Sequence, residues 1–297
     1  MSDDARLQSA VAEIAGAEVR ALRPVAGGDI NAAHLADLAD GRTVFVKSHR
    51  LGTTPPPGLY AAEAEGLRAL ADAVGDRADA LRVPAVLGFD EACLMLDAVA
   101  FTPGPADFEA QLGRGLATLH RNSAGRGPYG SDRPSFLGRW PQPPVAEPDF
   151  VGFWRDHRLL PWAGALPAGH GLADPIRRLA DRLPALLDGA ADEPVCLIHG
   201  DLWSGNAAWA DGATWIYDPA TYRAPREVEF GMTRLFGFGR RFEDAYREVW
   251  PLPEGWERRT ELYTLHHLLS HAWHFDPPEG GGYAGQARGV MARLLER

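Results

Sequence analysis

The sequence predicts an α+β protein of two lobes, a small β-rich lobe at the N-terminus and a larger, mainly helical lobe after it. In the first third of the 297 residues, short apolar segments alternate with glycine-containing turns, as they do in antiparallel strands. In most of the remaining chain, apolar residues recur at helical spacing. A segment rich in proline and glycine, 101–105, separates the two patterns. We therefore expect residues 1–102 and 103–297 to form separate lobes with a cleft between them.

The N-terminal lobe is predicted to begin with an amphipathic helix, on which Leu7, Val11 and Ile14 share one face. A meander of three strands follows, because Asp40-Gly41 between two apolar segments is a strong hairpin signal. A second helix and two further short strands complete the lobe. The elements expected here are a helix over 4–16, strands over 19–25, 32–38 and 43–48, a helix over 59–74, and strands over 85–89 and 93–99.

The C-terminal lobe is predicted to open with a helix over 108–123, which carries leucines at helical spacing. Most of the remainder is also predicted to be helical. Residues 195–220 are the exception, because two short apolar strands there have polar residues at their ends. The segment 125–150, rich in glycine, proline and tryptophan, is a long connection that either faces a substrate or covers the surface.

Composition restricts the possible partners. The net charge is −10 and the basic residues form no cluster, which argues against a nucleic-acid partner. Cys93 and Cys196 each lie among apolar neighbours, so we expect two buried thiols and no disulfide or metal pair. The chain begins without a signal-peptide pattern, and no apolar run has the length of a membrane span. These features predict a cytoplasmic protein without a membrane partner.

The segment His199-Gly-Asp-Leu-Trp-Ser-Gly-Asn206 lies between two predicted strands, and Asp218 follows the second. An aspartate, an asparagine five residues later and a second aspartate after the next strand match the spacing of a kinase catalytic loop and its metal-binding aspartate. Phosphoryl transfer needs a positioned acceptor hydroxyl and metal ions on the phosphate oxygens. In this interpretation Asp201 accepts or orients the hydroxyl proton, and Asn206 and Asp218 hold the Mg²⁺ that accompanies ATP. His199 would position the loop.

Two other interpretations of these residues exist. An isolated aspartate in a glycine-containing turn commonly shapes the turn or caps a helix. Here two acids and an amide recur in a strand–loop–strand setting with kinase spacing, which favours catalysis. His199 and Asp201 could instead bind zinc, but no further histidine or cysteine cluster accompanies them. Both features favour a phosphotransferase with a protein-kinase-like fold.

Lys47 ends the predicted strand Val44-Phe-Val-Lys and is the only lysine among the 30 basic residues. A kinase places its phosphate-binding lysine on the third strand and pairs it with a glutamate on the following helix. Glu63 is the preferred partner, because it shares a face with the apolar residues of the predicted helix, and Glu65 is the second choice. The alternative is a lysine that only solvates the end of a strand.

Two further segments are predicted to contact the nucleotide. Gly27 and Gly28, followed by Asn31, lie between the first two strands, where the backbone of a glycine turn could face phosphate oxygens. This segment is neither a G-x-G-x-x-G loop nor a Walker A motif, and a simple hairpin is the alternative. Asp97 and Val99 lead into the lobe boundary, where the backbone of a hinge would meet an adenine.

With these residues in place, the chain resembles the fructosamine kinase (ketosamine-3-kinase) family, within the wider group of aminoglycoside phosphotransferases and choline kinases. The resemblance extends over nearly the whole chain. It is most specific at 199–206 and at the Asp-Pro-Ala that begins with Asp218. The matching segments are Gly-Gly-Asp-Ile-Asn (27–31), Val-Phe-Val-Lys (44–47), Glu-Ala-Glu-Gly-Leu (63–67), Leu-His-Arg (119–121), His-Gly-Asp-Leu-Trp-Ser-Gly-Asn (199–206), Tyr-Asp-Pro-Ala (217–220), Arg-Glu-Val-Glu (226–229), Leu-Phe-Gly (235–237) and the histidine-rich 262–271.

The resemblance implies ATP- and Mg²⁺-dependent phosphorylation of the sugar 3-hydroxyl of ketoamines, the products of amine glycation. The 3-phosphate would then decompose and release the amine, which is a repair function. The partner would be a small ketoamine or another glycated amine. The chain departs from the family pattern around 144–150 and at Asp29, which stands where the family has serine.

Two other functions stay open at this point. One is a kinase of another amino sugar or amino alcohol. The other is a catalytically silent nucleotide-binding protein, which the presence of Lys47, Asp201, Asn206 and Asp218 disfavours.

Overall fold

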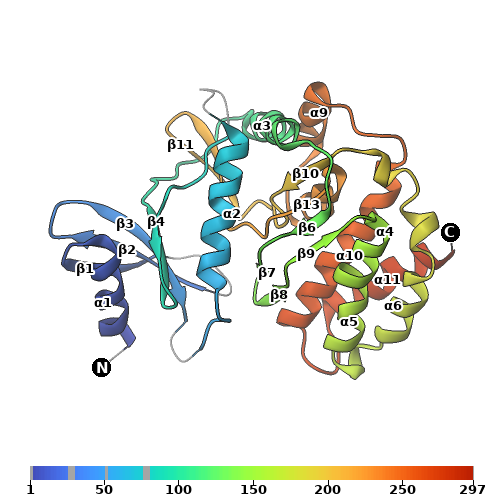
Figure 1. Cartoon of the computed structure of the whole chain (residues 1–297), viewed down its shortest axis with the longest axis horizontal. Coiled ribbons are helices and arrows are strands. Elements are labelled where there is room, and N and C mark those ends of the chain that lie inside the picture. The colour runs from blue at the N-terminus through green and yellow to red at the C-terminus, as the bar shows by residue number, and fades with distance from the viewer. Residues whose placement is uncertain (1–2, 26–30, 51–52, 76–80, 297) are drawn as a thin grey trace.

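The computed structural model describes residues 3–25, 31–50, 53–75 and 81–296. It is an α+β structure, with an N-terminal sheet on one side and most of the helices on the other (Figure 1). The long helix α2 (Leu59–Val74) stands between these two parts. The glycine-turn predictions at Gly27, Gly28 and Asp29 fall outside the described residues, and Asn31 is the first residue of β2.

The N-terminal sheet has five antiparallel strands in the order β1-β2-β3-β5-β4. The predicted Asp40-Gly41 hairpin joins β2 and β3, and Gly41 has a φ of 91°, a left-handed conformation that glycine adopts without strain. The strand bounds are β1 Val19–Val25, β2 Asn31–Leu38, β3 Thr43–His49, β4 Val86–Phe89 and β5 Cys93–Asp97.

Alternation along the central strands sends side chains to two different helices. Because successive strand residues point to opposite faces, Val44 and Val46 pack with α1 (Asp3–Ala15), whereas Phe45 packs with α2. The same alternation on β5 directs Cys93 to the α1 face and Leu94 to the α2 face. Lys47 follows Phe45 at the two-residue period and therefore faces α2. The register of β3 thus decides where the only lysine points.

The C-terminal part is mainly helical, with three small sheets. A four-stranded sheet has the order β10-β13-β6-β9, and β11-β12 and β7-β8 form hairpins. Its elements are α3 Phe108–Ser123, β6 Tyr129–Ser131, β7 Ser135–Leu137, β8 Trp140–Gln142, β9 Val145–Glu147, α4 Phe150–Trp154, η1 Arg155–Leu159 (a π-helix), α5 Leu160–Ala165, η2 Ala168–His170, α6 Ala173–Ala180, α7 Leu183–Leu186, η3 Ala190–Asp192, β10 Val195–Ile198, β11 Ala207–Ala210, β12 Ala213–Ile216, β13 Tyr222–Pro225, η4 Arg226–Glu229, α8 Phe230–Phe236, α9 Arg240–Val249, α10 Trp256–Phe275 and α11 Gly282–Glu296.

Two apolar cores stabilise this part. The larger core contains aromatic residues of α4 and α5 and the buried faces of α6, α10 and α11. The second core joins α3 and α9 to Ile216 and also contains Leu70 and Val74 from α2. The helix that faces Lys47 is therefore packed into the C-terminal part as well as onto the N-terminal sheet.

Two predictions about this part were wrong or incomplete. Two strands were expected, both within 195–220, yet that segment contains three, β10, β11 and β12, and β6–β9 and β13 form outside it. The segment 125–150, predicted as a long connection, contains four of these short strands.

The prediction of two buried free thiols, Cys93 in the N-terminal sheet and Cys196 in β10, is confirmed. Among the described residues, no helix combines the length and the apolar character that crossing a bilayer requires.

Candidate active site

Lys47 is the centre of the candidate site. Its Nζ donates to both carboxylate oxygens of Glu63 on α2, each at 2.8 Å. It also lies 3.0 Å from Oδ1 of Asp218. The lysine is 8 % exposed, so water does little to screen these contacts. The expected pairing of Lys47 with Glu63 is confirmed, and Glu65 pairs with a different cation, Arg133.

The electrostatics of this cluster keep the ammonium charged. Burial by itself lowers the pKa of Lys47, but the carboxylates of Asp218 and Glu63 outweigh burial and raise it above its ordinary value. Burial raises the pKa of Glu63, and the charge of Asp218 acts in the same direction. One cation between two carboxylates leaves the cluster with an excess of negative charge that a second cation would neutralise.

The loop after β10 brings Asp201, Asn206 and Asp218 together. Nδ2 of Asn206 donates to the backbone oxygen of Asp201 at 2.9 Å and is 3.4 Å from that of Asp218. Asp218 has a φ of 57°, a left-handed conformation that is uncommon outside glycine and recurs at functional sites. The 39 % exposed side chain of Asp218 contacts Lys47. Residues far apart in the sequence, 47, 201, 206 and 218, therefore meet at one place.

His199 is placed to hold the loop. Its Nε2 donates to the backbone oxygen of Tyr217 at 2.9 Å, and its Nδ1 accepts the N–H of Asp201 at 3.3 Å. Burial lowers the pKa of His199, so the ring is neutral with the proton on Nε2. Both ring nitrogens are occupied by backbone groups, which fits the predicted positioning role.

Asp201 lies in a negative environment. Burial raises its pKa to about 7, and the charges of Asp218 and Glu229 add to this effect while Lys47 opposes it. A carboxylate with a pKa near neutrality is suited to accept a proton, because a general base works best when its pKa is close to the working pH.

Glu229, to which the sequence pattern assigned no role, binds the backbone of the loop that contains Asp201. Its two oxygens accept the N–H groups of His199 at 2.6 Å and Gly200 at 3.0 Å, the two residues before Asp201. Nε2 of His120 on α3 is 3.5 Å from Glu229, and both side chains are almost fully buried. The segments containing these residues, 119–121 and 226–229, were visible only as family resemblance.

The predicted hinge residues, Asp97 and Val99, differ in which of their hydrogen-bonding groups are already occupied. The carboxylate of Asp97 accepts the N–H of Ala85 at 2.6 Å, so it is already engaged in the sheet. Val99 has no backbone hydrogen bond to another described residue. The next large side chain, Phe101, is 44 % exposed and stacks on Tyr217 with ring centroids 5.2 Å apart. Tyr217 directly precedes Asp218, so this aromatic pair lies at the edge of the candidate site, and no local sequence pattern marks it.

The oxygen groups present fit a magnesium ion shared with phosphates. Asp218 is partly exposed, and Oδ1 of Asn206 bonds to no other described residue. Mg²⁺ usually takes one or two protein carboxylates and completes its shell with phosphate oxygens and water. Across the described ranges, no group of three or more histidine, cysteine or acidic side chains could enclose a metal without such additional ligands.

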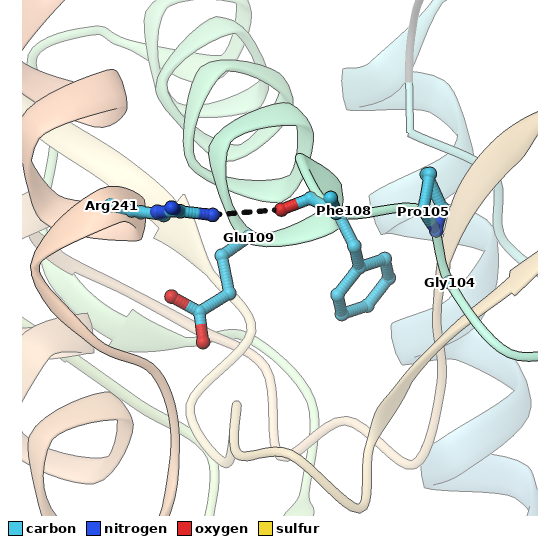
Figure 2. A pocket seen from close by; sticks show the side chains of 6 residues that line it. Gly104, Pro105, Phe108, Glu109 and Arg241 are labelled. Carbon is cyan, nitrogen blue, oxygen red and sulfur yellow. Dashed lines mark hydrogen bonds between the residues drawn. The ribbon is translucent and has the colours of Figure 1, made fainter.

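A cavity of about 470 Å³ lies elsewhere, at the start of α3 (Figure 2). Its lining includes Phe108, Glu109 and Arg241, and Arg241 donates to the backbone oxygen of Ala106 at 3.1 Å. None of the residues predicted to carry chemistry lines it. The cavity is therefore distinct from the Lys47 cluster.

Comparison with known proteins decides the family. The family model described as fructosamine kinase matches residues 2–297. The chain belongs to the fructosamine kinase family. Its fructosamine kinase relatives include a protein-ribulosamine 3-kinase, chloroplastic, of Oryza sativa subsp. indica, which is 32% identical over 99% of this chain and 84% of its own length. A probable ketoamine kinase of Thermus thermophilus is 37% identical over 88% of this chain and 89% of its own length.

Solved structures place this fructosamine kinase family member in the protein-kinase-like fold. A protein of Thermobifida fusca, provisionally named a fructosamine-3-kinase, superposes with a TM-score of 0.82 at 30% identity and covers 98% of this chain and 99% of its own. A macrolide 2'-phosphotransferase of Brachybacterium faecium has a TM-score of 0.57 at 18% identity, over 99% and 97% of the two chains. The predicted fold class and family are confirmed, and the chain is a kinase of this family.

Proposed function

We propose that this protein transfers the γ-phosphoryl group of ATP to the 3-hydroxyl of the sugar in ketoamines of the fructosamine or ribulosamine type. The observation that supports this most directly is the contact of Lys47 Nζ with two carboxylates, that of Glu63 at 2.8 Å and that of Asp218 at 3.0 Å. The names of the relatives, ribulosamine 3-kinase and ketoamine kinase, supply the acceptor class. The product would decompose to free amine, so the role would be the repair of glycated amines.

In the proposed reaction, the acceptor oxygen forms a bond to the γ-phosphorus. The bond from that phosphorus to the β,γ-bridging oxygen breaks, and ADP leaves. The hydroxyl proton passes to the carboxylate of Asp201. Bound Mg²⁺ would neutralise charge on the phosphate oxygens, with Asn206 and Asp218 as its protein ligands. Lys47, held by Glu63, would contact the phosphates of ATP.

We assign the nucleotide to residues 1–102 and the acceptor to residues 103–297. Backbone groups of Gly27, Gly28 and Asn31 would face phosphate oxygens, and the hinge at Asp97 and Val99 would meet the adenine. Since the carboxylate of Asp97 bonds to Ala85, its contribution would come from the backbone. The exposed ring of Phe101 offers a stacking surface close by. A cytoplasmic location, where ATP is supplied, stays a prediction of the sequence.

A panel of acceptors tests the proposed function. ATP consumption is measured with glycated lysine, a ribulosamine, an aminoglycoside and choline, and the position of the phosphate is read by NMR. We expect turnover with the two ketoamines and a phosphate on O3. Turnover confined to the aminoglycoside or choline would overturn the acceptor assignment.

The Asp201→Asn variant tests whether Asp201 accepts the proton in the chemical step. It keeps the shape of the side chain but cannot accept a proton, so kcat should fall by roughly 10²-fold or more. ATP affinity, measured by calorimetry with Mg²⁺ present, should stay within about threefold, because Asp201 makes no contact assigned to the nucleotide. No transfer to any acceptor by the wild-type protein, with ATP binding intact, would favour the silent nucleotide-binding alternative.

A further inference from the structure

The helix that carries Glu63 is fastened to the C-terminal part at several points. The backbone of α2 passes so close to the segment after Asp218 that a Cβ on Gly66 would lie 3.0 Å from Oγ1 of Thr221 and 3.3 Å from Cγ of Pro219. At the other end of α2, the amide of Asn122 on α3 donates to the backbone oxygen of Ala73 at 2.9 Å. The helix therefore belongs to both parts of the molecule (Figure 1).

A third attachment comes from the β7–β8 hairpin. We name residues 133–142 the strut. Phe136 of the strut packs into the cluster formed by Tyr60, Leu67 and other residues of α2 and β5. Just before β7, NH1 of Arg133 lies 3.1 Å from Oε1 of Glu65, two residues from Glu63. The strut thus contacts α2 beside the residue that holds Lys47.

The strut is held by contacts within the hairpin and with the helical core. Ser135 donates its hydroxyl to Gln142 across the hairpin at 2.9 Å, and both side chains are buried. At the far end, Trp140 stacks on Trp162 with ring centroids 4.3 Å apart and contacts Trp273 edge-on. Since one end of the hairpin is packed in the helical core and the other against α2, a displacement of α2 would have to break apolar contacts.

We propose that the strut holds α2 in the position in which Glu63 binds Lys47, so that Phe136 and Arg133 are positioning residues for phosphoryl transfer. The activity part of this inference rests on the proposed function. Phe136 supplies most of the contact, because the Arg133–Glu65 pair is 59% and 34% exposed and exposed ion pairs contribute little each.

Hydrogen–deuterium exchange tests the strut without reference to activity. In Phe136→Ala, amides of α2 should exchange on the order of tenfold faster than in wild type, while α10 and α11 are unchanged. The control is Leu87→Ala, which removes another partly exposed apolar side chain, 42% exposed on β4. Unchanged exchange in α2, or the same change in Leu87→Ala, would overturn the proposal.

A charge-reversal series decides the matter even if Phe136→Ala does not fold. Arg133→Glu and Glu65→Arg should each lower kcat/KM for ATP about two- to fivefold, the scale of an exposed ion pair, without changing KM for the acceptor. The double variant restores the pair with opposite signs and should return to within about twofold of wild type. Arg114→Glu, in an exposed pair with Glu248 on α3 and α9, is the matched control and should be neutral.

The outcomes separate the two proposals. A double variant no better than the single ones, or an equal effect of Arg114→Glu, would overturn the strut. A wild-type protein without transfer to ketoamines would overturn the proposed function. The hydrogen–deuterium exchange of α2 would still test whether the strut holds this helix.

Discussion

At the scale of residues, the ammonium of Lys47 stabilises two carboxylates that would otherwise repel each other. Glu63 is buried and Asp218 is partly exposed, so loss of the lysine affects them differently. Glu63 would be left as an unpaired buried charge, which is among the most destabilising changes a side chain can suffer. Lys47 therefore contributes to folding and, in the proposed function, to phosphate binding.

Replacing Lys47 by Met separates these contributions. The variant should lose roughly 10²-fold in kcat/KM for ATP and about 3–5 kcal/mol of stability, as expected when one partner of a buried pair is removed. The double variant Lys47→Met, Glu63→Gln leaves no unpaired buried charge, because Asp218 is partly exposed, and should recover most of the stability but none of the activity. Thermal unfolding and steady-state kinetics measure both. A single variant as stable and as active as wild type would show that Lys47 contributes neither to folding nor to phosphate binding.

Asp218→Asn tests the metal assignment. Asparagine tolerates the left-handed backbone at this position, so the fold should be retained. The amide is a poor substitute for a carboxylate ligand, and Mg²⁺-dependent turnover should fall by on the order of 10³-fold. Turnover is followed across a Mg²⁺ titration, with circular dichroism as the control for folding. A normal rate at ordinary Mg²⁺ would refute the role.

Single residues could be proposed from the sequence where they stand at a recognisable local spacing. Asp201, Asn206 and Asp218 were proposed because a kinase loop has a recognisable spacing. Lys47 was proposed because it is the only lysine of the sequence and ends the predicted third strand. Glu229 and Phe101 were missed, because an acid beneath the loop and an exposed ring have no spacing of their own. Only the folded chain shows that Glu229 receives the two N–H groups before Asp201.

At the scale of elements, long periodic segments were predictable and short ones were not. The helices over 59–74 and 108–123 form with the predicted bounds, because several turns of apolar spacing identify a helix. The strands β6–β9 and β13 are three or four residues long and were missed. Their pairing is between segments distant in sequence, as in β13 with β6, and three residues carry no period.

The close approach of α2 to the segment after Asp218 gives an element-scale prediction. Gly66→Ala should gain up to about 1 kcal/mol of helix propensity, but its methyl group must push α2 away from Thr221 and Pro219. We expect kcat/KM for ATP to fall about tenfold with little loss of stability. Adding Thr221→Ala removes the nearest obstacle and should restore activity in part. Full activity of Gly66→Ala alone would show that α2 can shift without consequence.

At the scale of the whole molecule, buried histidines make the fold sensitive to acid. Burial lowers the pKa of five of them below the ordinary value, to about 3 for His266 and about 4 for His274, and also for His120, His199 and His267. Below pH 6.5 the unfolded chain binds protons that the folded chain does not. The stability from these groups is therefore complete above about pH 6.5 and is lost as the pH falls toward 4.

Thermal unfolding between pH 8 and pH 4.5 measures this effect. The raised pKa values of Asp201 and Glu63 act in the opposite direction, so the comparison is made between variants. His266→Gln keeps an acceptor for the indole of Trp162 and removes one titrating group. Between pH 6.5 and 4.5 its stability should fall less steeply than that of wild type, by up to about 1.4 kcal/mol per pH unit. Equal slopes would mean that His266 binds protons equally in the folded and the unfolded chain.

The sequence by itself determined the chemical groups, the long helices, the β-rich start and the family, because each of these depends on spacing within a short stretch of chain. Only the tertiary structure decided which of those groups meet, that the segment 133–142 contacts α2, and that Glu229 accepts the N–H groups of His199 and Gly200. The physical reason is that burial and charge pairing join residues that are tens to hundreds of positions apart. Local spacing does not record such distances, and packing of the folded chain sets them.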